Sequence, residues 1–196
     1  MILFFGDSLT SGENNNFIGF VEKLNNKELI NYGVSGTCIG DYSLYPVQDT
    51  NLLQQLYKHS DELKKAKKIF LEYGSNDISS ILCEYVSLNQ VKIDFIKCID
   101  FIKQINNQCD ICFITLSKNV VNMAKGQCNY LNKDYLKTLS KKIKKDEWIR
   151  LYADFIVFIS SIVKTIELPL FDLDSDMIHP NDKGYEEIAN VIKESL

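Results

Sequence analysis

Short runs of apolar residues alternate along the chain with longer segments in which apolar residues recur every three or four positions. The short runs are typical of buried parallel strands, and the longer segments have the period of an amphipathic helix. We expect strands at Ile2–Phe5, Leu29–Tyr32, Ile69–Tyr73, Ile111–Leu116 and roughly Leu168–Leu173. Strands that alternate with helices indicate right-handed crossovers and a parallel sheet with helices on both faces.

The clearest helical pattern runs from Asn89 to Ile105 and carries a wide apolar face, which should lie against the sheet. Further helices are expected at Phe17–Asn25, Asn51–Lys65, Leu131–Lys144, Trp148–Ile166 and Asn181–Ser195. Two of these fall between the fourth and fifth strands, where a minimal flavodoxin-like unit needs one. The extra helix either shapes a pocket or enlarges the core. The pattern predicts a three-layer α/β/α fold with a five-stranded parallel, flavodoxin-like sheet.

Length and charge narrow the class of protein. A chain of 196 residues fits one domain, residues 1–196, that can bury a sizeable core. The net charge of −4 provides no basic surface for a nucleic-acid partner. The first strand leaves no room before it for an export signal, so a cytoplasmic protein is expected. The most apolar stretch, Phe155–Ile159, ends well short of the ~20 residues that span a bilayer, which favours a buried helix and no membrane insertion.

The cysteines are expected to be reduced thiols, because a cytoplasmic protein rarely forms structural disulfides. They are Cys38, Cys83, Cys98, Cys109, Cys112 and Cys128. Cys109 and Cys112 have a spacing that zinc sites use, but a zinc site would need a second pair or nearby histidines. We therefore expect buried thiols there, and neither a metal nor a cofactor.

Four short polar blocks carry the candidate chemistry, and three of them follow expected strands. They are Gly6–Gly12, Asn31–Gly36, Gly74–Asp77 and Asp176–Pro180. The first places Ser8 at the carboxyl end of a strand among small residues, where a nucleophile can be exposed. Taken alone, that block also fits an ordinary strand end in which glycine permits the turn and Asp or Ser caps the next helix.

Together and in this order, the four blocks resemble the SGNH (GDSL-type) hydrolase family. The resemblance spans the chain, and the four residues that name the family fall on Ser8, Gly36, Asn76 and His179. It implies a serine hydrolase that acts on esters. It also implies an oxyanion hole formed by the backbone N–H groups of Ser8 and Gly36 and the side-chain amide of Asn76.

A serine hydroxyl is a weak nucleophile at neutral pH, so it needs a base nearby and a third group that orients the base. The chain has two histidines, and His59 lies in a polar stretch that favours a solvent-facing surface position. His179 is therefore the candidate base. Asp176 is the candidate orienting carboxylate, because it precedes His179 by the family's three-residue spacing. Its rivals are Asp172 and Asp174.

Other polar residues near the blocks have structural interpretations. Asp7 and Asp77 are expected to hold their loops by accepting backbone hydrogen bonds. Asn76 on its own also fits a turn residue. Glu72 stands where a buried strand should be apolar, and it either contacts a polar substrate or lies at a wet end of the sheet.

The sequence therefore predicts a serine esterase that hydrolyses small acyl esters, in particular acetyl esters, through an acyl-enzyme intermediate. The family includes carbohydrate O-acetylesterases, short-chain lipases and thioesterases, and an acetylated sugar is the favoured substrate. Segments Asp41–Asp49 and Asn119–Asn129 are candidate pocket walls or ordinary loops. The alternatives are an acyltransferase with the same site and a non-catalytic binding module that retains the fold.

Overall fold

The computed structural model describes residues 1–45, 50–116, 118–134 and 142–196. Its parallel sheet has the order β2-β1-β3-β4-β5. The strands are β1 (Ile2–Gly6), β2 (Leu29–Asn31), β3 (Lys68–Glu72), β4 (Asp110–Thr115) and β5 (Lys164–Glu167). This is the predicted flavodoxin-like order, in which the chain changes direction across the sheet between β1 and β3. Ligands bind at such a switch point, beyond the carboxyl ends of the strands.

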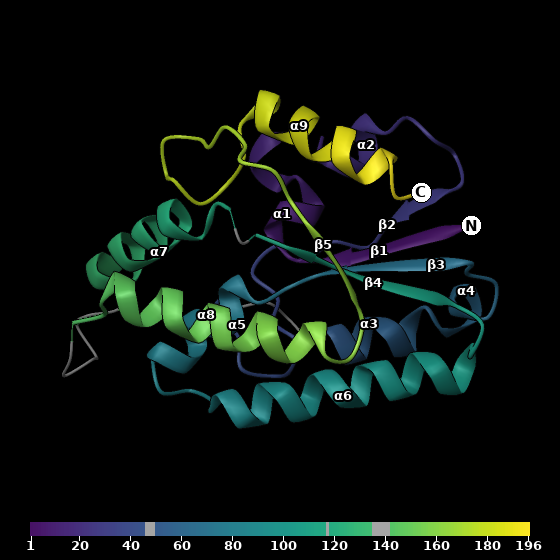
Figure 1. The fold of residues 1–196 in the computed structure, drawn as a ribbon, viewed down its shortest axis with the longest axis horizontal. Coiled ribbons are helices and arrows are strands. Elements are labelled where there is room, and N and C mark those ends of the chain that lie inside the picture. Colours follow the sequence, from purple (N-terminus) through teal and green to yellow (C-terminus); the bar gives the residue numbers. More distant parts are fainter. Residues whose placement is uncertain (46–49, 117, 135–141) are drawn as a thin grey trace.

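Helices cover both faces of the sheet, as predicted. Helices α1 (Ser8–Ser11), α2 (Phe20–Lys23) and α9 (Asp182–Lys193) lie above it in Figure 1. Helices α3 (Leu52–Lys58), α4 (Ser60–Leu63), α5 (Ser75–Leu82), α6 (Leu88–Ile105) and α8 (Lys145–Ser160) lie below it. Helix α7 (Val120–Asp134) lies at the end of the sheet where β1 and β4 finish. A short 3₁₀ turn, Glu13–Asn15, follows α1.

Aromatic side chains fill the layers on the two sides of the sheet. Phe4 of β1 stacks on Phe70 of β3 at 4.7 Å and meets Phe20 of α2 edge-on, on the upper side. On the lower side, Phe113 of β4 packs edge-on against Phe95 of α6. Because both faces of the central strands are buried, these strands read as continuous apolar runs rather than as alternating ones.

The expected fifth strand was misplaced. The structure has β5 at Lys164–Glu167 and an irregular segment over 168–173, and it ends α8 at Ser160 rather than Ile166. Among the described strands, β5 pairs only with β4, and only one of its side chains, Ile166, is buried. An edge strand with so little burial lacks the continuous apolar run on which the prediction relied.

The helix between β4 and α8 was also misplaced. The expected helix Leu131–Lys144 overlaps α7 only at its start, and its residues 135–141 lie outside the described residues. The predicted pocket-wall segment Asn119–Asn129 is instead largely helical. Apolar residues at positions 120, 123, 124, 128 and 131 do recur at helical spacing there, but intervening polar residues and Gly126 obscure that pattern.

Two expected helices are shorter than predicted. The helix expected at Asn51–Lys65 is interrupted at His59, where the backbone leaves helical geometry between α3 and α4. The helix expected at Phe17–Asn25 begins only at Phe20, because Phe17 has a positive φ of 61°.

The apolar stretch Phe155–Ile159 forms part of α8 and is buried on one face only. Phe155 and Ile159 lie in the core, whereas Val157 is 73% exposed. A search of the described residues finds no helix with the length and apolar character that crossing a membrane requires.

Candidate active site

Ser8 is the first residue of α1, directly after β1. Asp7 caps this short helix, with its Oδ1 accepting a hydrogen bond from the Leu9 N–H at 3.1 Å. Gly6 allows the turn to pack tightly, because a Cβ there would lie 2.0 Å from Thr10 Oγ1. The turn leaves Ser8 7% exposed, with its hydroxyl at the floor of a cavity.

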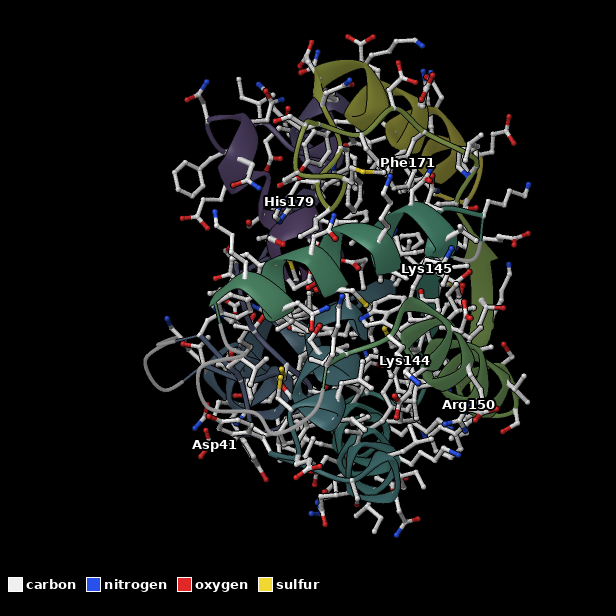
Figure 2. All side chains as sticks on the ribbon, turned by 90° about the vertical axis from the view of Figure 1, so that its left-hand side faces the viewer. Asp41, Lys144, Lys145, Arg150, Phe171 and His179 are labelled. Carbon is white, nitrogen blue, oxygen red and sulfur yellow. The ribbon has the colours of Figure 1, made fainter. Side chains whose placement is uncertain are left out.

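His179 and Asp176 meet Ser8 from the opposite end of the chain. The Nε2 atom of His179 lies 2.8 Å from Ser8 Oγ, and its Nδ1 atom lies 2.6 Å from Asp176 Oδ2. In Figure 2, which looks at the carboxyl ends of the strands, His179 lies beside the purple segment of α1. The structure therefore brings together the three residues that the sequence singled out as nucleophile, base and orienting carboxylate.

The charge state of Asp176 determines the tautomer of His179. Although partial burial opposes ionisation, hydrogen bonds from the His179 ring and from the backbone N–H groups of His179 and Ile178 lower the pKa of Asp176 to about 2. An ionised Asp176 accepts the Nδ1–H of a neutral imidazole. The Nε2 lone pair then faces the Ser8 hydroxyl, which is the arrangement that a general base requires.

The two rival carboxylates are engaged elsewhere. Asp172 Oδ2 pairs with Lys183 Nζ at 2.8 Å, and Asp174 Oδ1 accepts a hydrogen bond from the backbone of Ser175. Asp174 supports the loop through its backbone, because its N–H donates to the carbonyl oxygen of His179 at 2.8 Å.

Two helices hold the loop of Asp176 and His179 through glycines. A Cβ on Gly126 of α7 would lie 2.7 Å from the backbone oxygen of Asp176 and 2.8 Å from that of Met177. A Cβ on Gly184 of α9 would lie 2.1 Å from the backbone oxygen of Asp172. The loop is therefore in direct backbone contact with a helix on each side. Neither glycine stands out in the sequence.

The three groups expected to form an oxyanion hole line the same cavity. The Ser8 N–H is one of the N-terminal groups that a helix leaves without an intrahelical partner. Gly36 has a φ of 77°, a conformation that favours glycine. The side-chain amide of Asn76 donates to the backbone oxygen of Thr37 at 3.0 Å and to Asp7 Oδ2 at 3.2 Å. Both of its hydrogens therefore already have protein acceptors.

The two buried aspartates hold loops, as expected, and they also accept side-chain donors. Asp7 Oδ2 accepts a hydrogen bond from Ser75 Oγ at 2.9 Å as well as one from Asn76. Asp77 accepts hydrogen bonds from the backbone of Ile39 and Gly74 and from the Tyr42 hydroxyl. Burial raises the pKa of Asp77 to about 7 despite these hydrogen bonds.

Glu72 lies in neither of the places considered for it. It is 1% exposed and does not line the cavity. Its Oε2 accepts a hydrogen bond from Thr10 Oγ1 at 3.1 Å beneath the Ser8 turn. The sequence provides no signal for this contact, because it depends on the parallel register that places Gly6 beside Glu72.

The cavity above Ser8 has a volume of about 740 Å³, which falls in the range of small-molecule sites. Besides the residues already described, most of the residues that line it have polar side chains, although apolar atoms form the larger part of the lining surface. These polar residues are Glu13, Asn14, Ser35, Tyr45, Gln127, Asn129, Tyr130, Lys133 and Ser175. Both predicted wall segments contribute, through Tyr45 and through α7, whereas residues 46–49 lie outside the described residues. The contribution of the Glu13–Asn15 turn was not predicted.

The remaining candidates lie away from the cavity. His59 is half-buried rather than solvent-facing, because its ring stacks on Tyr32 with centroids 3.7 Å apart. Partial burial lowers its pKa. All the cysteines have free thiols, and Cys109 is partly exposed. In the part of the chain that the structure describes, no group of three or more His, Cys, Asp or Glu side chains is arranged to hold a metal ion.

Fold and site together define a class: a flavodoxin-like α/β protein with a Ser-His-Asp constellation at the switch point of its sheet. The model of the GDSL-like lipase/acylhydrolase family matches residues 4–187. The chain belongs to this family and is an ester-hydrolysing serine hydrolase. No curated protein matches the sequence.

Solved structures share the fold at low sequence identity. A lipase from goat rumen metagenome, Lip_vut3, has a TM-score of 0.60 and 17% identity, covering 99% of this chain and 96% of its own. The acetyl xylan esterase AlAXEase has a TM-score of 0.59 and 15% identity, with coverage of 100% and 98%. TesA has a TM-score of 0.60 and 13% identity, with coverage of 100% and 97%.

The backbone contact at Gly126 generates a prediction for Gly126→Ala. In an ordinary helix this change is stabilising by ~1 kcal/mol, but overpacking typically costs ~1–3 kcal/mol, and the Cβ would press on the Asp176 loop. We expect a lower melting temperature and a lower ester turnover, because the loop that carries His179 is displaced. Thermal unfolding and turnover of a chromogenic acetate ester would measure both.

Lys125→Ala is the matched control, because Lys125 is exposed on the same helix and does not line the cavity. It should leave the melting temperature and turnover close to wild type. A Gly126→Ala protein that is more stable than wild type and fully active would show that the loop accommodates the methyl group without effect.

Proposed function

We propose that the protein hydrolyses small acyl esters, in particular acetyl esters of a polar alcohol such as a sugar, through an acyl-enzyme on Ser8. The observation that carries this proposal is the continuous chain from Ser8 Oγ through His179 to Asp176, with separations of 2.8 and 2.6 Å, at the floor of the cavity. Ser8 is the nucleophile, His179 the general base and Asp176 the carboxylate that orients it.

In the first half-reaction, Ser8 Oγ forms a bond to the ester carbonyl carbon while its proton passes to His179 Nε2. The carbonyl oxygen becomes an oxyanion, which the N–H groups of Ser8 and Gly36 and the amide of Asn76 stabilise. The intermediate then expels the alcohol, which takes the proton from His179. Asp176 remains ionised and stabilises the imidazolium while it exists.

In the second half-reaction, water replaces the alcohol. His179 takes a proton from the water as its oxygen attacks the acyl-enzyme carbonyl, and it returns that proton to Ser8 Oγ as the acid leaves. Stabilising the oxyanion requires Asn76 to share or release one existing hydrogen bond.

The lining of the cavity supports a polar alcohol. The amides of Asn14 and Asn129 can donate to and accept from hydroxyl groups, and Gln127, whose Oε1 already accepts from Ser79, can donate. The rings of Tyr45 and Tyr130 stack with centroids 6.0 Å apart, and they provide flat apolar surface among these amides. Amides beside aromatic rings suit a ligand that has hydroxyl groups on a flat, partly apolar body, as sugars do.

A serine-directed fluorophosphonate tests the nucleophile, with the labelled residue located by mass spectrometry. Esters of one alcohol with acyl chains from acetyl to octanoyl then test chain length, and acetylated sugars test the alcohol. We expect labelling of Ser8 and the fastest turnover with acetyl. Absence of labelling would refute the nucleophile, and acyl transfer to added alcohol in preference to water would identify an acyltransferase.

Ser8→Ala should abolish ester turnover and leave the melting temperature close to wild type, because among the described residues the hydroxyl forms a hydrogen bond with the His179 ring alone. His179→Ala should be about as damaging as Ser8→Ala, and the double variant should be little worse than either, since the two act as a unit. Steady-state turnover of the three variants would measure this. Multiplicative losses would argue against a shared mechanism.

Asp176→Asn should lower turnover by up to ~10⁴-fold while the protein remains folded. The backbone N–H groups of Ile178 and His179 would hold the amide oxygen, so the amide NH2 group would face Nδ1 and favour the wrong tautomer of His179. Asp174→Asn is the matched control, since the Asp174 side chain contacts Ser175 and not the ring. Turnover and circular dichroism of both variants would decide the matter. A severe defect in Asp174→Asn beside an active Asp176→Asn would show that the orienting carboxylate is wrongly assigned.

Asn76→Ala should lower kcat by ~10²–10³-fold with a much smaller change in KM, because the amide acts mainly on the transition state. It should also lower the melting temperature, since a hydrogen bond to Thr37 is lost. Ser75→Ala removes the other side-chain donor to Asp7 Oδ2 and serves as the control. That variant should lose some stability but keep kcat. Equal kcat losses in the two variants would assign Asn76 a structural role only.

A further inference from the structure

Two carboxyl groups lie buried beneath the nucleophile turn, outside the cavity and outside the reaction just described. Asp7 is fully buried and Glu72 nearly so. They are neighbours across the β1–β3 pair, because Gly6 lies beside Glu72 in the register and the Asp7 N–H donates to the Glu72 backbone oxygen at 3.2 Å. Two adjacent buried carboxylates cannot both be ionised at low cost, so the pair retains a proton.

The hydrogen bonds indicate which group holds that proton. Burial raises the pKa of Asp7 as well as that of Glu72, but Asp7 accepts three donors, namely the Leu9 N–H, the Ser75 hydroxyl and the Asn76 amide, and such a set favours its anion. Glu72 accepts only the Thr10 hydroxyl on its side chain, and its Oε1 contacts no donor among the described residues. As a carboxylate it would be an unsatisfied buried anion, whereas as an acid it can donate to Asp7.

We propose that Glu72 is a positioning residue of the active site, which acts as a neutral acid that anchors Thr10 of α1 and donates its proton to the Asp7 carboxylate. Each of the two hydrogen bonds of Glu72 leads to a residue that holds part of the active site. Thr10 belongs to the same four-residue helix as Ser8, and Asp7 holds the amide of Asn76. One buried proton thereby sets the positions of the nucleophile and of an oxyanion donor. The inference rests on the proposed function.

The electrostatic surroundings agree with a neutral Glu72. Burial, followed by the charge of Asp7 and a hydrogen bond with it, raises the pKa of Glu72 well above its usual range. The titratable groups that face the pair are Tyr73 after β3, Tyr152 on α8, Tyr185 on α9, Asp77 on α5, Cys38 and His179. Burial raises the pKa of each of the three tyrosines, so they are neutral and provide no cation to balance a second carboxylate.

Glu72→Gln and Glu72→Leu form the matched pair that tests this role. Glutamine keeps an acceptor for Thr10 and a donor for Asp7, so kcat should stay within about threefold of wild type. Leucine keeps the bulk and removes both hydrogen bonds, so kcat should fall by about 10- to 100-fold with little change in KM, because displacement of Ser8 misaligns the attack. An unchanged kcat in Glu72→Leu would overturn the proposal, and so would equal losses in both variants.

Infrared spectroscopy tests the proton without any substrate. At a pH of about 9, where Asp77 with its pKa of about 7 is ionised, the wild-type spectrum should contain the carbonyl band of a protonated carboxyl group. Glu72→Gln should remove that band, and a band that persists would overturn the assignment. Because this readout involves no ester, it also separates failure of the inference from failure of the proposed function, which wild-type labelling and turnover test independently.

If Glu72→Leu fails to fold, Thr10→Val tests the same link. Valine has nearly the shape of threonine and removes only the hydroxyl that Glu72 accepts. Turnover should fall by about tenfold while labelling still occurs at Ser8 at a reduced rate. Wild-type kcat in a folded Thr10→Val protein would overturn the role of the anchor.

Discussion

The buried carboxylate of Asp7 is the contact on which the rest of the site depends. One oxygen caps the helix that begins with Ser8, and the other holds Ser75 and Asn76 at the start of α5. A buried anion is costly unless donors surround it, and these donors come from two separate strand ends. The same hydrogen bonds that satisfy Asp7 therefore fix the distance between the helices that follow β1 and β3.

The His179 side of the site is held in a different manner. Asp176 and His179 belong to one turn, so their mutual geometry is local, and two backbone N–H groups fix the carboxylate. The position of that turn relative to Ser8 is a tertiary matter. Gly126 and Gly184 fix the position of the turn, because they allow two helices to contact the loop backbone. Polar contacts therefore position Ser8, whereas close packing positions the turn that carries His179.

The sequence predicted the central strands well, and the residues that it singled out for the site lie together in the structure, for related reasons. Strands buried on both faces produce apolar runs, and their carboxyl ends carry the short blocks that contain Ser8 and Asn76. The edge strand β5 was missed because only one of its residues, Ile166, is buried, so the strand has no continuous apolar run. Helix α7 was misread because one side lines a cavity, so polar residues replace part of its apolar face.

What the sequence did not reveal depends on register and close approach. The contact between Thr10 and Glu72 joins residues 62 positions apart, and the pairing of β1 with β3 alone brings them together. Gly126 likewise matters because its backbone lies against a loop some 50 positions later in the chain. Neither contact can be recognised from the neighbouring sequence. Gly126 is simply a glycine in a helix, and Glu72 is simply a glutamate in a strand.

Ser8 and His179 are 171 positions apart in the sequence. Helices α2 and α9, from the two ends of the chain, also pack together, and Lys23 of α2 pairs with Asp182 of α9 at 2.6 Å. During synthesis the first half of the sheet emerges long before the loop that carries Asp176 and His179. A nascent or truncated chain therefore has the Ser8 hydroxyl without its His179 partner, even when its early strands have folded. The contact between Ser8 and His179 can form only after the last loop has been made, so the complete constellation is a property of the finished polypeptide rather than of the folded sheet.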